Sequence, residues 1–232
     1  MSPALESLQA RLGYVFRQPA LLLEAVTHPS YRQEHPGEGD SNQRLEFLGD
    51  AVLQLILTER LFELFPADRE GMLSKRRAKL IEGKFLSSLA LELGLDACLR
   101  LGSAEEAAGG RLKRSALEDA MEGLAGALYL DAGFAEAGRI VRALYGSLPD
   151  RIEPVLASDN PKGRLQELVQ PRHGNQAVRY AVVRVTGADH ARRYEVAVYV
   201  NELALGTGQG TSKKLAEEAA AAAALAALQE KG

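Results

Sequence analysis

The chain has 232 residues, an apolar fraction of 46% and a formal net charge of −3, which suits one large folded domain or two smaller ones and excludes a disordered chain. No apolar run approaches the roughly 18 residues that a membrane helix needs, and the first residues lack the features of a signal peptide, so we expect a cytoplasmic protein without a membrane span. The single cysteine, Cys98, excludes an internal disulfide and a cysteine-based zinc site, and the histidines are scattered.

The first part of the chain is predicted to be all helical, because its apolar residues recur at helical spacing from residue 4 to about 147. A leucine stripe covers residues 5–12, and Pro19 opens a second helix. The polar stretch 31–41, which contains proline and glycine, is typical of a loop. Further helices are expected over residues 43–65, 70–81, 82–94, 115–131 and 135–147.

The second part of the chain has a different period. Residues 149–158 show no sustained helical stripe and contain two prolines, Pro149 and Pro154, which favours a linker. A short helix over 162–170, three alternating strands within 178–182, 194–200 and 203–207, and an alanine-rich helix over 213–229 then give the order αβββα. We therefore expect an all-α domain over 1–148, a linker over 149–158 and a small α+β domain over 159–232.

Charge differs between the two parts. Residues 1–150 hold 17 Lys and Arg against 22 Asp and Glu, a balance of −5, whereas residues 151–232 hold 11 against 9, a balance of +2. Only clustering of the basic residues on one face would make the second part an electrostatic surface for nucleic acid.

Two of the predicted helices carry acids inside apolar runs. Glu46 and Asp50 are four residues apart and share a helix face, and Asp119 and Glu122 are close neighbours on a second helix. Burying unpaired carboxylates costs several kcal/mol each, and neither helix has enough Lys or Arg to pair with them. An all-carboxylate set suits a hard cation such as Mg²⁺.

Local signals near these acids predict how the two helices begin and meet. Ser115 and Glu118 have the spacing of a capping box, which would place the helix start at Ser115. Gly49, Gly123 and Gly126 are each unfavourable by about 1 kcal/mol in a helix interior. We expect them to allow close approach of the two acidic helices.

The motifs NQRLEFLGDAVL (residues 42–53) and LEDAMEGLAGALYLD (residues 117–131), followed by an αβββα tail, resemble bacterial ribonuclease III over nearly the whole chain. The resemblance implies an endonuclease domain followed by a double-stranded-RNA-binding domain. It implies Mg²⁺-dependent hydrolysis of duplex RNA, with Mn²⁺ as a possible substitute, leaving 5′-phosphate and 3′-hydroxyl ends with short 3′ overhangs. Processing of ribosomal RNA precursors and other structured transcripts, by a homodimer, is also implied.

The resemblance carries the following roles onto this chain. Asp50 and Glu122 would be catalytic, and Glu46, Asp119 and Glu122 would bind the metal. Glu70 and Gln43 would support the active site, although Gln43 stands where many bacterial members have glutamate, so an ionised role there is excluded. Phe47 would contact the partner protomer, whereas the residues alone also allow it to be core.

RNA contacts are implied for three regions of the second domain. They comprise Gln166, Glu167 and Gln170 in its first helix, His190 in a strand loop, and Ser212, Lys213 and Lys214 at the last helix. Glu217 replaces the usual third basic residue there, which is expected to weaken phosphate binding. In the first domain, the basic residues of 75–79 and of 111–114 would either grip the RNA backbone or be ordinary surface, and His28 is interpreted as structural.

Two other function classes remain. A binding-only protein could keep the fold, but it would gain little from holding four repelling acids together. A carboxylate-bridged di-iron bundle would need Glu-x-x-His pairs, and the sequence has none.

Overall fold

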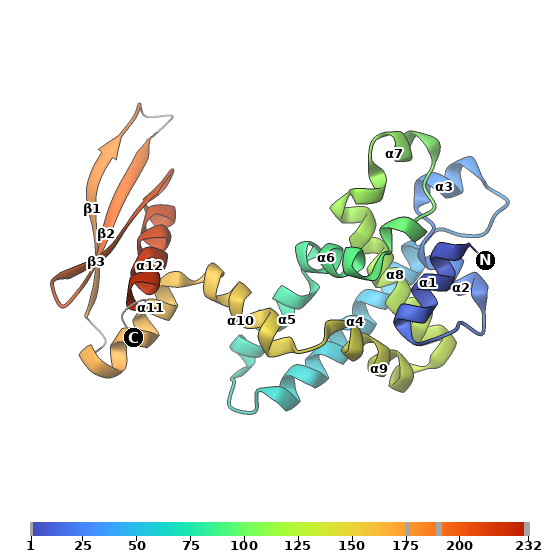
Figure 1. Cartoon of the computed structure of the whole chain (residues 1–232), viewed down its shortest axis with the longest axis horizontal. Coiled ribbons are helices and arrows are strands. Elements are labelled where there is room, and N and C mark those ends of the chain that lie inside the picture. Colours follow the sequence, from blue (N-terminus) through green and yellow to red (C-terminus); the bar gives the residue numbers. More distant parts are fainter. Residues whose placement is uncertain (1, 175–176, 189–191, 230–232) are drawn as a thin grey trace. The chain divides into compact units, whose positions relative to one another are not determined.

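The computed structural model describes residues 2–174, 177–188 and 192–229. Contacts divide the chain into two compact units, Met1–Ile152 and Glu153–Gly232, and each is described by itself. The first unit is helical and the second contains a sheet (Figure 1). This confirms the predicted fold class, an all-α domain followed by a small α+β domain.

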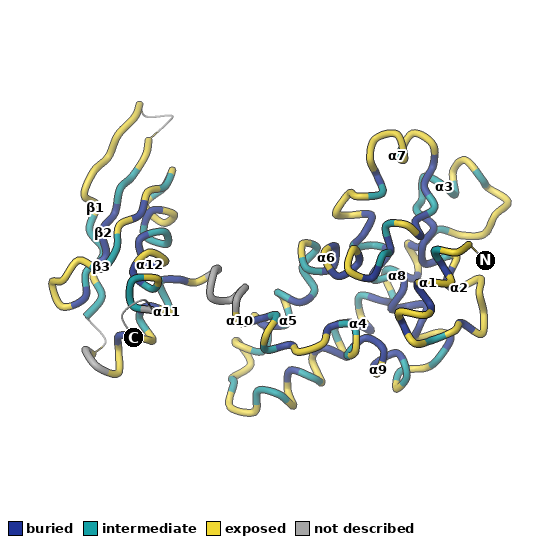
Figure 2. The backbone as a smooth tube through the Cα atoms, in the orientation of Figure 1, coloured by how far each residue is buried: buried dark blue, intermediate teal, exposed yellow. Residues whose placement is uncertain are grey.

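The core of the first unit is built around its two longest helices, α4 and α8, whose buried residues are coloured dark blue in Figure 2. The helices of this unit are α1 (Pro3–Leu12), α2 (Pro19–Ala25), α3 (Pro29–Glu34), α4 (Gln43–Leu64), α5 (Glu70–Ile81), α6 (Gly83–Leu93), α7 (Ser103–Ala107), α8 (Arg114–Ala132) and α9 (Phe134–Tyr145). Short 3₁₀ turns, η1 (Asp96–Cys98) and η2 (Gly110–Leu112), lie on either side of α7. The segments with apolar residues at helical spacing thus form the predicted helices, because the apolar side of these helices is buried in this core.

Two segments expected to be irregular contain helix. The predicted loop 31–41 includes most of α3, whose first turn is capped by the His28 side chain accepting the Ser30 N–H. The predicted linker is the helix α10 (Leu148–Asp159). Pro149 does not prevent it, because proline is tolerated in a first helical turn where its missing N–H has no partner to lose.

The beginning of α10 belongs to the first unit. Ile152 and Leu148 are buried in it, and Arg151 Nη2 lies 2.8 Å from Glu92 Oε2 of α6. The Arg151 guanidinium also lies over the Phe85 ring. These contacts supply the apolar and ionic partners that a short polar helix lacks by itself.

The second unit is an antiparallel sheet with two helices on one face (Figure 1). Its elements are α11 (Pro161–His173), β1 (Val178–Thr186), β2 (Arg193–Val200), β3 (Leu203–Gly210) and α12 (Lys213–Gln229), with strand order β1-β2-β3. The core joins Val196 and Val198 of β2 to the buried alanines of α12. A Cβ at Gly208 of β3 would overlap the backbone of α12 at Ala220, so small residues on both elements allow this close packing.

In the part of the chain that the structure describes, no helix is both long enough and apolar enough to cross a membrane.

Candidate active site

The two acidic helices are in backbone contact. A Cβ at Gly49 of α4 would overlap the carbonyl oxygen of Glu122 on α8 and lie 2.8 Å from the Gly126 nitrogen. A Cβ at Gly126 would likewise overlap the carbonyl oxygen of Leu45. The expectation that glycines allow a close approach of the two acidic helices is confirmed for Gly49 and Gly126, whereas a Cβ at Gly123 would lie 3.1 Å from the carbonyl oxygen of Ala25 on α2. The α4–α8 crossing brings the Glu46–Asp50 turn of α4 beside the acids of α8.

Four predicted acids lie half-buried at this crossing. Glu46, Asp50, Asp119 and Glu122 are neither fully exposed nor fully buried. Asp50 accepts hydrogen bonds from Gln54 Nε2, at 3.0 and 2.9 Å to its two oxygens. Within the described residues, no Lys or Arg side chain forms an ion pair with any of the four. The negative charge is therefore held in a partly desolvated place where no Lys or Arg of the described residues forms an ion pair with it.

Electrostatics show that these side chains affect one another. Burial, followed by the charges of Asp50, Glu118, Glu46 and Asp119, raises the pKa of Glu122 to about 8. Burial and then the neighbouring acids also raise the pKa of Glu46. Burial raises the pKa of Asp119, and the nearby His28 opposes that shift. Carboxyl groups with raised pKa values are typical of functional sites as well as of structural clusters.

Glu118 is a fifth acid at the α4–α8 crossing. From the sequence it is predicted instead to belong to a capping box. The helix α8 begins at Arg114, its N-cap residue is Lys113, and no side chain caps it. The capping-box prediction for Ser115 and Glu118 is therefore wrong. The useful signal was spacing, because Glu118 precedes Glu122 by one helical turn and shares its face.

The donor chemistry of the cluster fits a hard divalent cation, because the side chains offer only oxygen atoms and lack cationic partners. As the side chains stand, no three Asp, Glu, His or Cys residues among 2–174, 177–188 and 192–229 form a group that could hold a metal ion. The Asn42 side chain, at the N-terminus of α4, also lacks a hydrogen-bond partner. The residue is 1% exposed, and neither its side-chain oxygen nor its side-chain nitrogen is hydrogen-bonded.

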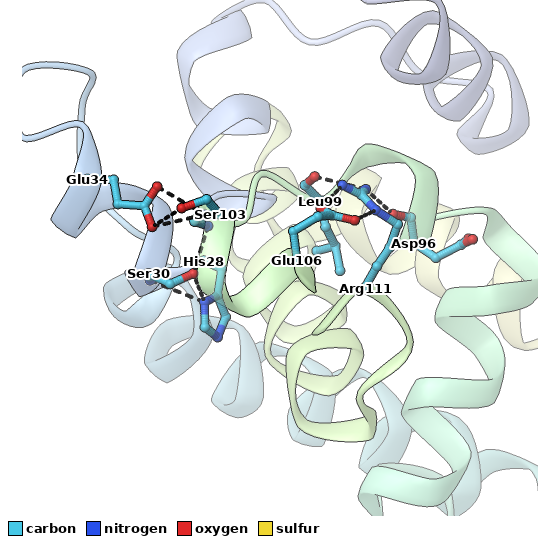
Figure 3. A network of polar contacts seen from close by, with 9 residues as sticks. His28, Ser30, Glu34, Asp96, Leu99, Ser103, Glu106 and Arg111 are labelled. Atoms are coloured by element: carbon cyan, nitrogen blue, oxygen red, sulfur yellow. Dashed lines mark hydrogen bonds and ion pairs between the residues drawn. The ribbon is translucent and has the colours of Figure 1, made fainter. Parts of the chain in front are cut away.

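His28 belongs to a network that fixes the loop around α7 (Figure 3). Its Nδ1 lies 2.8 Å from Ser30 Oγ, and that oxygen accepts the Gly102 N–H at 2.9 Å. Glu34 accepts the N–H of Ser103 at the start of α7. The hydrogen bonding expected for His28 is confirmed, and its ring is also near Asp119.

Most of the basic residues considered for RNA contact in the first unit have protein partners. Arg76 is buried, with Nε 2.7 Å from Asp68 Oδ2 and its guanidinium over the Phe65 ring. Arg111 donates to the carbonyl oxygens of Asp96 and Leu99 (Figure 3). Three more contacts are Lys79 with Glu82, Arg77 with Thr58 and Lys113 with Glu105. Lys75 and Arg114 are exposed and have no such partner within the described residues.

The remaining predicted residues of the first unit lie at the surface. Gln43 is exposed at the first position of α4, and its Oε1 accepts from Ser41 Oγ at 3.4 Å. Glu70 is exposed at the first position of α5 and accepts from Ser74 Oγ; it is not among the charges that shift the clustered acids. Phe47 is 83% exposed, which excludes its interpretation as a core residue.

In the second unit, two of the three predicted regions lie in described elements. Gln166, Glu167 and Gln170 are on α11, where Glu167 and Gln170 are exposed. Lys213 and Lys214 are exposed at the start of α12, and Ser212 Oγ accepts the Leu215 N–H as a helix cap. His190 lies outside the described residues.

Glu217, which stands where a third basic residue was expected, forms an ion pair with Lys162 of α11. The Lys162 ammonium also lies 4.6 Å from the centre of the Tyr180 ring. Glu217 therefore joins α12 to α11 and reduces the positive charge that Lys162 presents.

Comparisons with known proteins match both units of the chain. A family model described as ribonuclease-III-like matches residues 18–147, and a double-stranded RNA binding motif matches residues 161–228. A Ribonuclease 3 of Carboxydothermus hydrogenoformans is 42% identical over 227 residues, covering 96% of this chain and 95% of that protein. A Ribonuclease 3 of Pseudomonas fluorescens is 44% identical over 229 residues, covering 98% and 97%. The solved nuclease domain of a Campylobacter jejuni ribonuclease III, described for flexibility in a region involved in dimer formation, is 41% identical with a TM-score of 0.57, covering 65% of this chain and 99% of that one.

Proposed function

Because the chain belongs to the ribonuclease III family and is an endoribonuclease with a double-stranded-RNA-binding domain, we propose that it cleaves duplex RNA with Mg²⁺ at the α4–α8 crossing. The observation that carries this proposal is the convergence of half-buried acids that form no ion pair with a Lys or Arg in the described part of the chain. A divalent cation would neutralise the charge that the protein leaves unbalanced there.

We assign Glu46, Asp119 and Glu122 as metal ligands, with Asp50 and Glu122 as the catalytic pair. A bound Mg²⁺ would supply a water of lowered pKa and a positive charge beside the leaving oxygen. The Gln54 amide orients Asp50 through its two hydrogen bonds. The pKa of Glu122 is raised to about 8, so binding of a cation would favour loss of its proton.

The proposal extends to products and targets. We propose ends with 5′-phosphates, 3′-hydroxyls and short 3′ overhangs, processing of ribosomal RNA precursors and other structured transcripts, and Mn²⁺ as a substitute cation. Family membership supports these details. A cytoplasmic location is consistent with the free, buried thiol of Cys98. Gln43 and Glu70 are proposed to support substrate binding by hydrogen bonds from the site's edge.

We also propose that the enzyme acts as a homodimer through α4. Phe47, Leu55 and Phe62 are 83%, 56% and 72% exposed, and their spacing of eight and seven residues places them on one side of the helix. Large exposed apolar side chains that gather on one surface mark protein–protein contacts. Each protomer would then contribute one acidic cluster.

For the second domain, we propose that α11 and the start of α12 contact the RNA backbone and minor groove. Exposed Lys213 and Lys214 at a helix N-terminus can bind phosphates. Recognition of this kind depends on duplex shape more than on sequence. We keep 1–148 and 159–232 as the proposed domain limits, with 149–158 between them as a helical connection.

The test is cleavage of a long duplex RNA by the parent protein and by Glu122→Gln, each with Mg²⁺. The parent should cut duplex RNA but neither single-stranded RNA nor duplex DNA. Glu122→Gln should lose at least about a hundredfold in cleavage rate, since it removes a ligand charge, while RNA binding by gel shift stays nearly unchanged.

Glu6→Gln is the matched control, because Glu6 is exposed on α1 and lies outside the cluster. Circular dichroism of all three proteins establishes that each is folded. An unchanged cleavage rate in folded Glu122→Gln would contradict the metal assignment. A parent protein that binds duplex RNA tightly but never cuts it would support the binding-only alternative.

A further inference from the structure

Glu118 has a defined place at the edge of the acidic cluster. Its carboxylate lies directly over Gly83, the first residue of α6: a Cβ there would overlap Oε2 and would lie 2.6 Å from Cδ and 2.7 Å from Oε1. Glu118 is half-buried. The glycine therefore leaves the space in which this side chain lies, and the position of the charge depends on that space.

Glu118 faces the acids that were assigned to the metal. It is the sequence neighbour of Asp119 and lies one turn before Glu122 on α8. Its charge is among the causes that raise the pKa of both Glu46 and Glu122. Arg114 is the one positive charge among the causes acting on Glu118 itself, and no ion pair joins the two within the described residues.

A second observation concerns a buried polar side chain without a hydrogen-bond partner between α4 and α8. The Asn42 side chain is buried and unpartnered, and its Cβ lies 3.4 Å from the position of a Cβ on Gly123 of α8. Asn42 precedes Glu46 by one turn of α4. The contact between the start of α4 and α8 thus contains a buried donor and acceptor in addition to the unpaired acids of the cluster, and leaving such groups without partners is unfavourable for folding.

We propose that Glu118 is a positioning residue of the acidic cluster, whose carboxylate over Gly83 strengthens the binding of the divalent cation and lowers the stability of the cation-free protein. The inference rests on the proposed function, because it assigns Glu118 to the same metal site. Glu118 acts on the cation through its negative charge and through the neighbouring ligands, without contacting the cation. Both its charge and its position over Gly83 should therefore affect cation binding.

The experiment measures Mn²⁺ binding to the full-length, RNA-free protein by electron paramagnetic resonance of free Mn²⁺, together with melting temperature with and without Mg²⁺. Glu118→Gln should weaken Mn²⁺ binding about threefold to tenfold, because one nearby negative charge is lost. It should also raise the melting temperature without cation and reduce the increase that Mg²⁺ produces. Glu6→Gln, which removes one charge from α1, should change neither quantity.

Gly83→Ala tests position without changing charge. The added methyl group displaces the Glu118 carboxylate, so Mn²⁺ binding should weaken by a smaller factor than in Glu118→Gln. In cleavage assays, Glu118→Gln should raise the Mg²⁺ concentration that gives half the maximal rate by a larger factor than it lowers the maximal rate.

Mn²⁺ affinity in Glu118→Gln within twofold of the parent overturns the inference, as does equal weakening in Glu6→Gln. A lower cation-free melting temperature with unchanged Mn²⁺ affinity would mean a purely structural role. If Glu118→Gln does not fold, unchanged Mn²⁺ binding in Gly83→Ala overturns the inference and weaker binding supports it. A parent protein that binds Mn²⁺ but does not cut duplex RNA overturns the proposed function alone.

Discussion

At the scale of single residues, Asp131 shows that an acid in an apolar motif need not serve catalysis. It ends the second acidic motif but lies outside the cluster, and its carboxylate accepts hydrogen bonds from the Tyr14 hydroxyl and the N–H groups of Arg17 and Gln18, at 2.7, 2.8 and 2.9 Å. The side chain joins the end of α8 to the segment between α1 and α2. It is structural because its acceptor capacity is used within the protein.

Asp131→Asn should lower the free energy of unfolding by about 2–3 kcal/mol, because the amide nitrogen faces a donor that the carboxylate oxygen had satisfied. Urea denaturation at pH 7 measures this change. Asp40→Asn is the control, since Asp40 makes only a 3.8 Å ion pair and is largely exposed; it should change little. Equal stability of Asp131→Asn and the parent would contradict the structural role.

The same residue gives a pH dependence. Burial alone would raise the pKa of Asp131, but hydrogen bonds from Tyr14, Arg17 and Gln18 and the charge of Arg17 lower it overall. Its stabilising contribution is therefore fully present above about pH 4, the unfolded value, and is lost as pH falls through the lower folded pKa. The stability difference between parent and Asp131→Asn should shrink below pH 4.

At the scale of elements, the crossing of α4 and α8 depends on glycine. Gly49→Ala adds a methyl group that overlaps the Glu122 carbonyl oxygen, and the opposing atoms are backbone, which cannot rotate away. We expect a loss of about 3 kcal/mol or more in the free energy of unfolding, together with lower Mn²⁺ affinity because the acids move apart. Thermal and urea denaturation measure the first effect.

Gly71→Ala on α5 is the matched control. Nothing lies within 4 Å of a Cβ at Gly71, so alanine should stabilise the helix by up to about 1 kcal/mol. Equal destabilisation by the two substitutions would show that the overlap at the α4–α8 crossing does not explain the result.

The elements also show why some predictions succeeded. Long amphipathic helices such as α4 and α8 follow from periodicity because their apolar faces must be buried. The short α3 and α7 have too few residues for a periodic signal. They form because His28 and Glu34 provide side-chain acceptors for their first N–H groups. The first turn of α10 likewise depends on α6 through Arg151 and Glu92.

At the scale of the whole molecule, the apolar surface of α4 should determine the oligomeric state. Phe47→Glu places a charge where a partner's apolar surface is proposed to pack, and desolvating that charge without a partner is unfavourable by several kcal/mol. We expect dissociation of the dimer to monomers and a fall in duplex cleavage. Analytical ultracentrifugation measures the first effect.

Val15→Glu serves as the control, because Val15 is 73% exposed in the segment after α1 and is not part of α4. It should leave the sedimentation coefficient unchanged. A parent that sediments as a monomer at micromolar concentration, or a Phe47→Glu variant that remains a dimer, would contradict the proposed interface.

The sequence by itself determined the family, the order of the longer helices and of the strands, and the presence of acids on apolar helices. These properties follow from periodicity and from motifs of contiguous residues, which need no knowledge of the fold. The same local signals misassigned Glu118 to a capping box.

Only the tertiary structure decided which side chains meet. It placed Glu118 over Gly83, left Phe47 exposed and buried Arg76 beside Asp68. The burial, charge partners and role of a side chain depend on how the elements pack around it, and no local sequence pattern records that packing.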